Sequence, residues 1–246
     1  MGKCGAVWRK EMTACLVSPF YYGLAALFLA VTGLNFWKLC ADSAGQPVAM
    51  SVLLFGPLFF WILVLALIAA LTMRLLAEET RSGTLELLLA APLRDTDLVL
   101  GKFAAALTQF ALIVLPVAAY PWMLRVCSTG VWSVDRAQVA VGFGGLLAMG
   151  ACYTAAGLLI SAVARGPVLA AVGSFALLSL LFFLDVFWYA GGAAVLQRFL
   201  DYASSVQHAT DFARGIVDSR AIVFFGSGTA LFLFLAVKAV ESRRWR

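Results

Sequence analysis

The stretch RLLAEETRSGTLELLLAAPLRDTDLVLGK, residues 74–102, lies between two long apolar runs. It holds nine of the chain's thirty-one Lys, Arg, Asp and Glu residues, so it is much more polar than its neighbours. It also contains Leu85-Glu86-Leu87-Leu88-Leu89, and an ordinary polar linker has no need of such a leucine-rich run. How this segment connects the two apolar runs decides the fold.

The overall composition is that of a membrane protein. Of the 246 residues, 63% are apolar and 13% are charged, whereas charged residues make up about 25% of an average soluble protein. The net charge of +5 could indicate a nucleic-acid partner, but the Lys and Arg residues are scattered singly between apolar runs. We therefore expect these charges to mark loops and membrane edges, with no nucleic acid bound.

Six apolar runs are free of charge and long enough to cross a bilayer, which takes roughly 20 residues. They predict an all-α membrane protein with one transmembrane domain over residues 1–246. The predicted transmembrane helices cover residues 20–39, 51–73, 103–124, 138–163, 167–188 and 221–238.

The distribution of cations predicts the orientation. If the N-terminus is cytoplasmic, the inner segments hold twelve Lys and Arg residues and the outer segments hold six. Because cytoplasmic segments carry the excess of Lys and Arg, both termini are predicted inside. Residues 5–18, which mix charges with apolar side chains before the first span, predict an amphipathic helix along the inner interface.

The predicted spans contain no ionisable residue near their centres, which argues against an ion-coupled carrier. The chain also has no phosphate-binding loop and no metal-binding spacing, so we expect no catalytic site and no metal site. His208, the only histidine, is interpreted as a solvated or hydrogen-bonded loop residue. A disulfide between Cys40 and Cys127 stays open. Any energy for transport would then have to enter from outside the chain.

The quoted segment predicts a second, shorter amphipathic helix. Ser82 and Gly83 disfavour a continuous helix, Thr84 can cap a new one, and Pro92 ends it, which gives residues 84–91. The leucines of this helix share one face. It could be the docking site of a cytoplasmic protein, or a plain interfacial helix that anchors a loop.

The fourth predicted span carries small residues at every fourth position. Residues in this spacing share one face of a helix and let another backbone approach closely. The stripe predicts a helix-packing surface, within the chain or with a second copy, that consists of Gly144, Ala148, Cys152 and Ala156.

Taken together, these motifs resemble those of ABC-2 type permeases, specifically the gliding-motility and nitrous-oxide-maturation branch. The resemblance rests on the quoted segment, on WRKEMTACLVSPFYYG (residues 8–23) and on HATDFARGIVDSRAIVFF (residues 208–225). In the quoted segment and the residue before it, the matching residues are Met73-Arg74, Glu78-Glu79, Ser82-Gly83-Thr84, Glu86-Leu87-Leu88-Leu89, Pro92 and Gly101-Lys102.

The resemblance implies a six-helix permease subunit of the bacterial cytoplasmic (inner) membrane, working as a homodimer or pseudodimer. A separate cytoplasmic ATPase would bind ATP and Mg²⁺, and an auxiliary extracytoplasmic subunit would complete the complex. Helix 84–91 would be the coupling helix, and residues 190–220 would form a re-entrant outer segment. The residues implied in coupling to the ATPase are Glu78, Glu79, Arg81, Gly83, Thr84, Glu86, Leu88 and Leu89.

Two other classes of function stay open from the sequence. One is a membrane subunit that does not transport but anchors an ABC-like complex or passes mechanical force across the membrane. The other is an ion-coupled carrier, for which the spans lack buried charge.

Overall fold

The chain folds into a bundle of α-helices. The computed structural model describes residues 3–42, 54–84, 94–120, 122–123, 135–183 and 205–243, and these residues contain helices but no strand. The elements are α1 (Lys3–Val17), α2 (Pro19–Asp42), α4 (Leu58–Thr72), α5 (Ala77–Ser82), α7 (Asp95–Val114), the 3₁₀ helix η1 (Leu115–Ala119), α9 (Arg136–Val163), α10 (Pro167–Phe182), α13 (Ser205–Ala213) and α14 (Ser219–Arg243).

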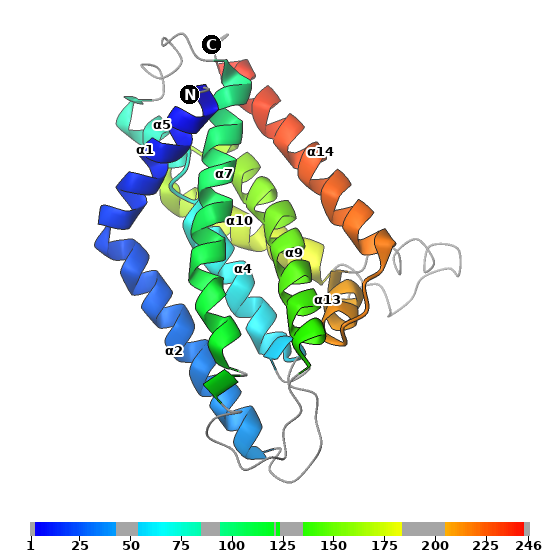
Figure 1. Ribbon diagram of the computed structural model, residues 1–246. Helices are drawn as coiled ribbons and strands as arrows, with labels where there is room; N and C mark the ends of the chain where they lie inside the picture. The colour runs from blue at the N-terminus through cyan, green and yellow to red at the C-terminus, as the bar shows by residue number, and fades with distance from the viewer. Residues whose placement is uncertain are drawn as a thin grey trace.

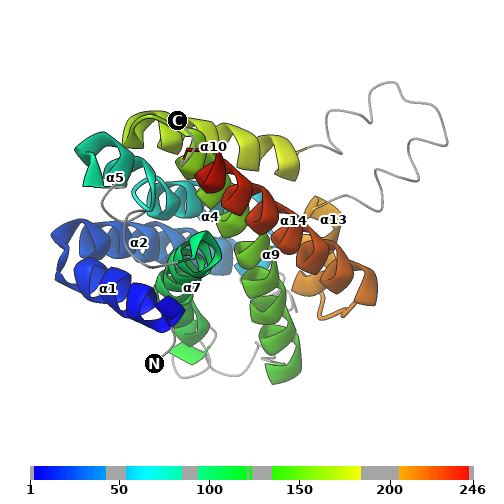
Figure 2. The ribbon, with the colours of Figure 1, turned by 90° about the horizontal axis from the view of Figure 1, so that it is seen from above.

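Helix α9 occupies the middle of the bundle. It packs against α4, α7, α10, α13 and α14, and α1 lies along α7 on another side of the bundle. Figure 1 shows that both termini lie at one end of the molecule, together with α1 and α5. The view from above in Figure 2 shows α2 and α14 on opposite sides of the bundle. The described part of the charged segment between α4 and α7, which includes α5, thus lies at the end that carries the termini.

The predicted class, an all-α membrane protein, is confirmed. Within the described residues, five segments are long and apolar enough to cross a membrane: Pro19–Asp42, Leu58–Ser82, Asp95–Ala119, Arg136–Val163 and Ser219–Arg243. The predicted fifth span is represented by α10, a shorter apolar helix that begins at the predicted residue, and positions 184–188 lie outside the described residues. The orientation with both termini inside stays a prediction.

Two prolines shift boundaries that hydropathy predicted wrongly. The second span was expected to begin at residue 51, but α4 begins only after Pro57, whose backbone is extended with ψ 129°. Proline suits this position because the first turn of a helix needs no N–H donor from it. The third span was expected over 103–124, but α7 begins at Asp95 and turns into a 3₁₀ helix at Leu115, next to Pro116. Pro116 cannot donate the α-helical hydrogen bond at that point.

Several other helix ends also differ from the prediction by a few residues. The interface helix extends over residues 3–17, where 5–18 was predicted, and the first span over 19–42, where 20–39 was predicted. The fourth span begins at residue 136, two residues early, while α14 begins at 219 and continues to Arg243, five residues past the expected end. The longer α14 reaches the end of α9, as described below.

Glycines of α9 allow its neighbours to approach closely. A Cβ atom on these glycines would collide with the side chain that occupies the space in front of each one. The four pairs are Gly142 with Phe55, Gly145 with Phe212, Gly150 with Phe110, and Gly157 with Thr72. These glycines therefore set how closely α9 packs against α4, α7 and α13.

The predicted small-residue stripe lies on a different face of α9, and only part of it is buried. Cys152 and Ala156 are buried, and a Cβ atom on Gly228 of α14 would lie 2.8 Å from Cys152 Sγ. Gly144 is exposed with open space in front of it, and Ala148 is half-buried. At Cys152, then, the stripe packs within the chain, against α14.

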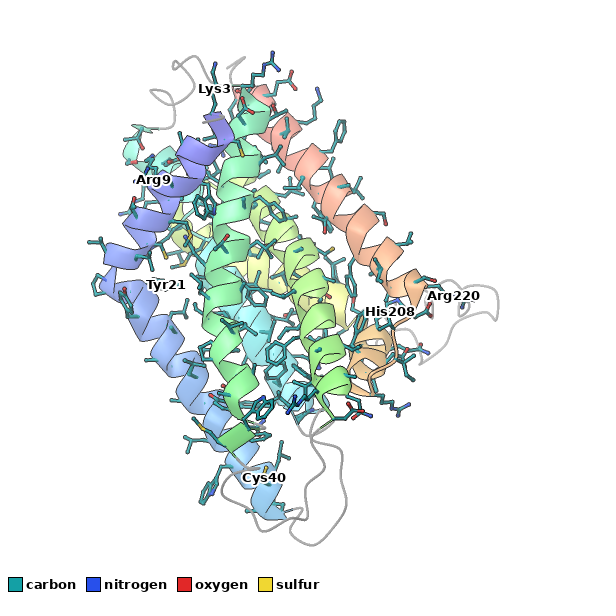
Figure 3. The ribbon with its side chains drawn as sticks, in the orientation of Figure 1. Lys3, Arg9, Tyr21, Cys40, His208 and Arg220 are labelled. Atoms are coloured by element: carbon teal, nitrogen blue, oxygen red, sulfur yellow. The ribbon has the colours of Figure 1, made fainter. Side chains whose placement is uncertain are left out.

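The structure also bears on two predictions for the end of the bundle away from the termini, the loop position of His208 and the open disulfide between Cys40 and Cys127. His208 lies within α13, is only 5% exposed and contacts the rings of Phe224 and Phe225, so the interpretation as a loop histidine is wrong. Figure 3 shows His208 beside α14 and Cys40 at the end of α2 far from the termini. Cys40 is buried with a free thiol, whereas Cys127 and the first part of segment 190–220 lie outside the described residues.

We predict that Gly150→Ala destabilises the protein by about 1–3 kcal/mol, because the added methyl group overpacks the space held by the Phe110 ring. Gly144→Ala on the same helix is the matched control, since nothing lies within 4 Å of its new methyl group. Thermal unfolding of the detergent-purified variants measures both effects. Equal melting temperatures for the two variants would contradict the packing argument.

Candidate functional site

The site begins at a break in the helical backbone between α4 and α5. The α4 helix ends at Thr72, and residues 73–76 form a turn before α5 starts. Ser161 of α9 is buried here, and its Oγ accepts hydrogen bonds from the N–H groups of Leu76 and Ala77, each at 3.1 Å. Unsatisfied N–H groups are costly at this depth. A side chain from α9 therefore stabilises the bend.

Lys102 of α7 binds the other side of the break. Its side chain is 1% exposed, and its Nζ donates to the carbonyl oxygen of Leu75 at 2.6 Å. The same Nζ lies 2.9 Å from Glu11 Oε1 and 2.9 Å from Glu79 Oε1. An ammonium group has three N–H donors, and these three acceptors match them. We call Lys102, Glu11, Glu79 and the Leu75 carbonyl the Lys102 cluster.

The Lys102 cluster joins three elements that are distant in the sequence. Glu11 comes from α1, Glu79 from α5, and Lys102 from α7. Lys10 of α1 lies 3.6 Å from Glu79 and adds a weaker, more exposed pair. Two cations thus face two carboxylates, so the charge of this partly buried group is balanced.

The residue before Lys102 brings α1 into position. A Cβ atom on Gly101 would lie 2.7 Å from Val7 Cβ, so only glycine permits this approach of α1 to α7. A second contact joins the same two helices, because Trp8 Nε1 of α1 donates a hydrogen bond to Thr108 Oγ1 of α7 at 3.2 Å. Gly101 and Lys102 act together, because the glycine admits α1 and the lysine binds it.

Arg243, near the end of α14, forms a second connection to α5. Its Nη1 donates to Thr80 Oγ1 at 2.9 Å. Its Nη2 donates to the carbonyl oxygens of Val163 and Ala164, at 3.0 and 3.2 Å. These carbonyls end α9, where a cation is favoured by the helix dipole. Sequence reasoning missed this role of Arg243, which was counted only as an inner-side cation.

The predicted coupling residues are divided by the structure. Glu78, Arg81, Gly83 and Thr84 are exposed at the end with the termini. Glu79 is instead directed into the Lys102 cluster, and its side chain is 15% exposed. Gly83 has φ +71°, the left-handed conformation that commonly follows a helix and favours glycine. The structure does not describe residues 85–91 of the predicted helix 84–91, which include Glu86, Leu88 and Leu89. The coupling role of these residues stays a prediction.

A cavity of about 370 Å³ lies beside the Lys102 cluster, at the bend between α1 and α2. Its wall includes Cys15, and burial, aided by the negative charge of Glu11, raises the pKa of this thiol to about 11. Cys15 is therefore a protonated, poorly reactive thiol at neutral pH. Tyr21, another wall residue, lies on α2 close to this bend (Figure 3). Within the described parts of the chain, no group of three His, Cys, Asp or Glu side chains could hold a metal ion.

Comparison with protein families identifies the family of the chain. The family model described as "ABC-2 family transporter protein" matches residues 6–239, which extend from α1 to the last turns of α14. The chain belongs to the ABC-2 transporter family. A search of curated proteins finds no match.

Membership of the ABC-2 family has direct consequences. The chain is a multi-pass membrane protein and a permease subunit of an ABC transporter. A permease of this family implies a partner ABC ATPase and typically a dimeric arrangement. The family description names no branch, so the gliding-motility and nitrous-oxide-maturation branch stays a prediction.

We predict that Lys102→Met destabilises this ABC-2 permease by about 3–5 kcal/mol, because two carboxylates and a carbonyl lose their shared partner in a buried site. Adding Glu11→Gln and Glu79→Gln to Lys102→Met should restore part of the loss. Chemical or thermal unfolding in detergent measures each free energy.

The matched control is Lys238→Met. Lys238 forms an even shorter pair, 2.7 Å to Glu241, but both side chains are exposed. Exposed pairs contribute only about 0–1 kcal/mol. If Lys102→Met proves no more harmful than Lys238→Met, the Lys102 cluster does not stabilise the fold.

Proposed function

We propose that this ABC-2 permease couples a separate cytoplasmic ATPase, which binds ATP and Mg²⁺, to export across a bacterial inner membrane. The observation that carries the proposal is the bonding of α5. This six-residue helix is bonded to α1, α7, α9 and α14. The proposal treats α5 and the helix that follows it as the input site.

The exposed side of α5 supplies a docking surface. Four exposed residues of this surface lie at the end with the termini: Glu78, Arg81, Gly83 and Thr84. Glu78 and Arg81 give the surface charges of both signs. The excess of cations predicts that this end is cytoplasmic. Gly83 ends α5 in a left-handed conformation, and the predicted coupling helix over residues 84–91 follows directly in the sequence. The partner is proposed to contact both segments.

Motion of α5 would spread through specific bonds. Glu79 reaches α7 through Lys102, and Lys102 reaches α1 through Glu11. The start of α5 is bonded to Ser161 of α9, and Thr80 is bonded to Arg243 of α14. Because separating buried charges is costly, the Lys102 cluster is expected to move as one unit.

Transport then requires two arrangements of these helices with different contacts to the ATPase. Closure of two ATPase subunits would displace α5 in each of two permease copies, as rigid-body motion of packed helices. We propose a homodimer or pseudodimer, with an auxiliary extracytoplasmic subunit on the other side. The two copies would change the exposure of a path between them.

The test is purification of the tagged permease from its native membrane in detergent, with mass spectrometry of the proteins that accompany it. We expect an ABC ATPase with the parent chain. Arg81→Glu and Glu86→Lys should each reduce its recovery at least about tenfold, as losing one or more charge-assisted contacts would. The matched control is Arg220→Glu, an exposed arginine at the start of α14, outside the proposed surface.

Three outcomes are informative. Loss of the ATPase from both variants but not from the control supports docking at α5 and its following helix. Full recovery in both variants would place docking elsewhere. Absence of any ATPase from the parent would favour the non-transporting anchor instead.

A further inference from the structure

The cavity at the bend between α1 and α2 is large enough to hold a ligand. Its volume of about 370 Å³ lies within the range of small-molecule sites. Its wall is built by α1, α2, α4, α5 and α7, and it meets the proposed docking surface only at Glu78. A ligand here would contact both the interface helix and the spans.

Gln109 gives the cavity a buried polar group without a partner. It is 6% exposed and lies seven residues beyond Lys102 on α7, about 10 Å deeper along the helix. Its backbone carbonyl accepts from the Tyr21 hydroxyl at 3.2 Å. Gln109 lines the cavity, and its side-chain amide has no hydrogen bond to any described residue. A ligand with a hydrogen-bonding group can pair with this amide from within the cavity.

The mouth of the cavity carries charges of both signs. Lys10 and Arg74 supply exposed cations, and Arg74 is held over the Phe20 ring, 4.4 Å from its centroid. Glu78 lies 3.6 Å from Arg74. Glu79 Oε2 is buried and has no hydrogen-bond partner within the described ranges. Cations and carboxylates side by side match a ligand that is itself zwitterionic.

We propose that this cavity binds a zwitterionic aminophospholipid from the leaflet on the side of the termini. The lipid phosphate lies between Lys10 and Arg74, and its ammonium group lies at Glu78. The Gln109 amide hydrogen-bonds an ester carbonyl deeper in the cavity, against the apolar side chains of Ala70 and Leu71.

The order of polarity with depth favours a lipid over a soluble zwitterion. Lys10, Arg74 and Glu78 are exposed, whereas the neutral Gln109 amide lies about 10 Å deeper than Lys102 along α7. Charged groups followed by a neutral polar group with depth match the order of groups along a phospholipid. A purely anionic lipid offers no cation to Glu78, which also lines the cavity. The bound lipid would occupy the bend between α1 and α2, next to Glu78 at the edge of the proposed docking surface.

Native mass spectrometry of the full-length permease, released from micelles that contain equal amounts of phosphatidylethanolamine and phosphatidylglycerol, tests the proposal. We expect one phosphatidylethanolamine to be retained in preference to phosphatidylglycerol. Arg74→Ala should weaken its retention about tenfold and Gln109→Leu about threefold, as expected for a charged and a neutral hydrogen bond. Melting temperatures confirm that each variant is folded.

Matched controls keep the readout specific. Lys10→Ala should weaken retention, whereas Lys238→Ala should not, although the two lysine side chains are almost equally exposed, at 59% and 57%. Gln207→Leu on α13 controls for Gln109→Leu. The proposal is overturned if phosphatidylglycerol is retained equally or better, or if Arg74→Ala and Gln109→Leu retain phosphatidylethanolamine as the parent does.

Discussion

The interaction on which the rest of this structure depends is the burial of one ammonium group near the membrane surface. A buried Lys must find three acceptors inside the protein, and Lys102 finds them in α1, in α5 and in the backbone where α4 breaks. The break would be costly without Lys102 and Ser161, because its backbone groups would lack partners. Helices α1, α5 and α7 are therefore positioned by a single set of bonds.

The second constraint is the close packing of α9, which gives these bonds a firm support. Glycines at positions facing Phe55, Phe110, Thr72 and Phe212 let α9 approach its neighbours more closely than any other residue would. Ser161 and the last carbonyls of α9 then bond to α5 and Arg243. The same helix thus forms the centre of the bundle and fixes one side of the candidate site. Helix α9 therefore contributes both to the core packing and to the candidate site.

The sequence could predict the class and the approximate spans, because runs of apolar residues without charge have few other uses. It missed boundaries where a proline decides, at Pro57 and Pro116, since hydropathy alone is blind to a missing N–H donor. It singled out Gly101 and Lys102 as a motif but could not find their partners, because Val7 and Glu11 lie some ninety residues away in the chain. No local pattern encodes such a distance.

The position of Lys102 in the chain also bears on how the protein is made. Glu11 and Glu79 both precede Lys102, so both counter-charges have already been synthesised when the lysine reaches the membrane. A lone lysine opposes insertion by about 2.5–3.5 kcal/mol at the centre of a membrane helix and by less near a helix end, where Lys102 lies. Partners that are already in place reduce that smaller cost. Domains generally fold from the N-terminus during synthesis. The order of the charges along the chain therefore lets biosynthesis proceed without ever leaving this cation unmatched in lipid.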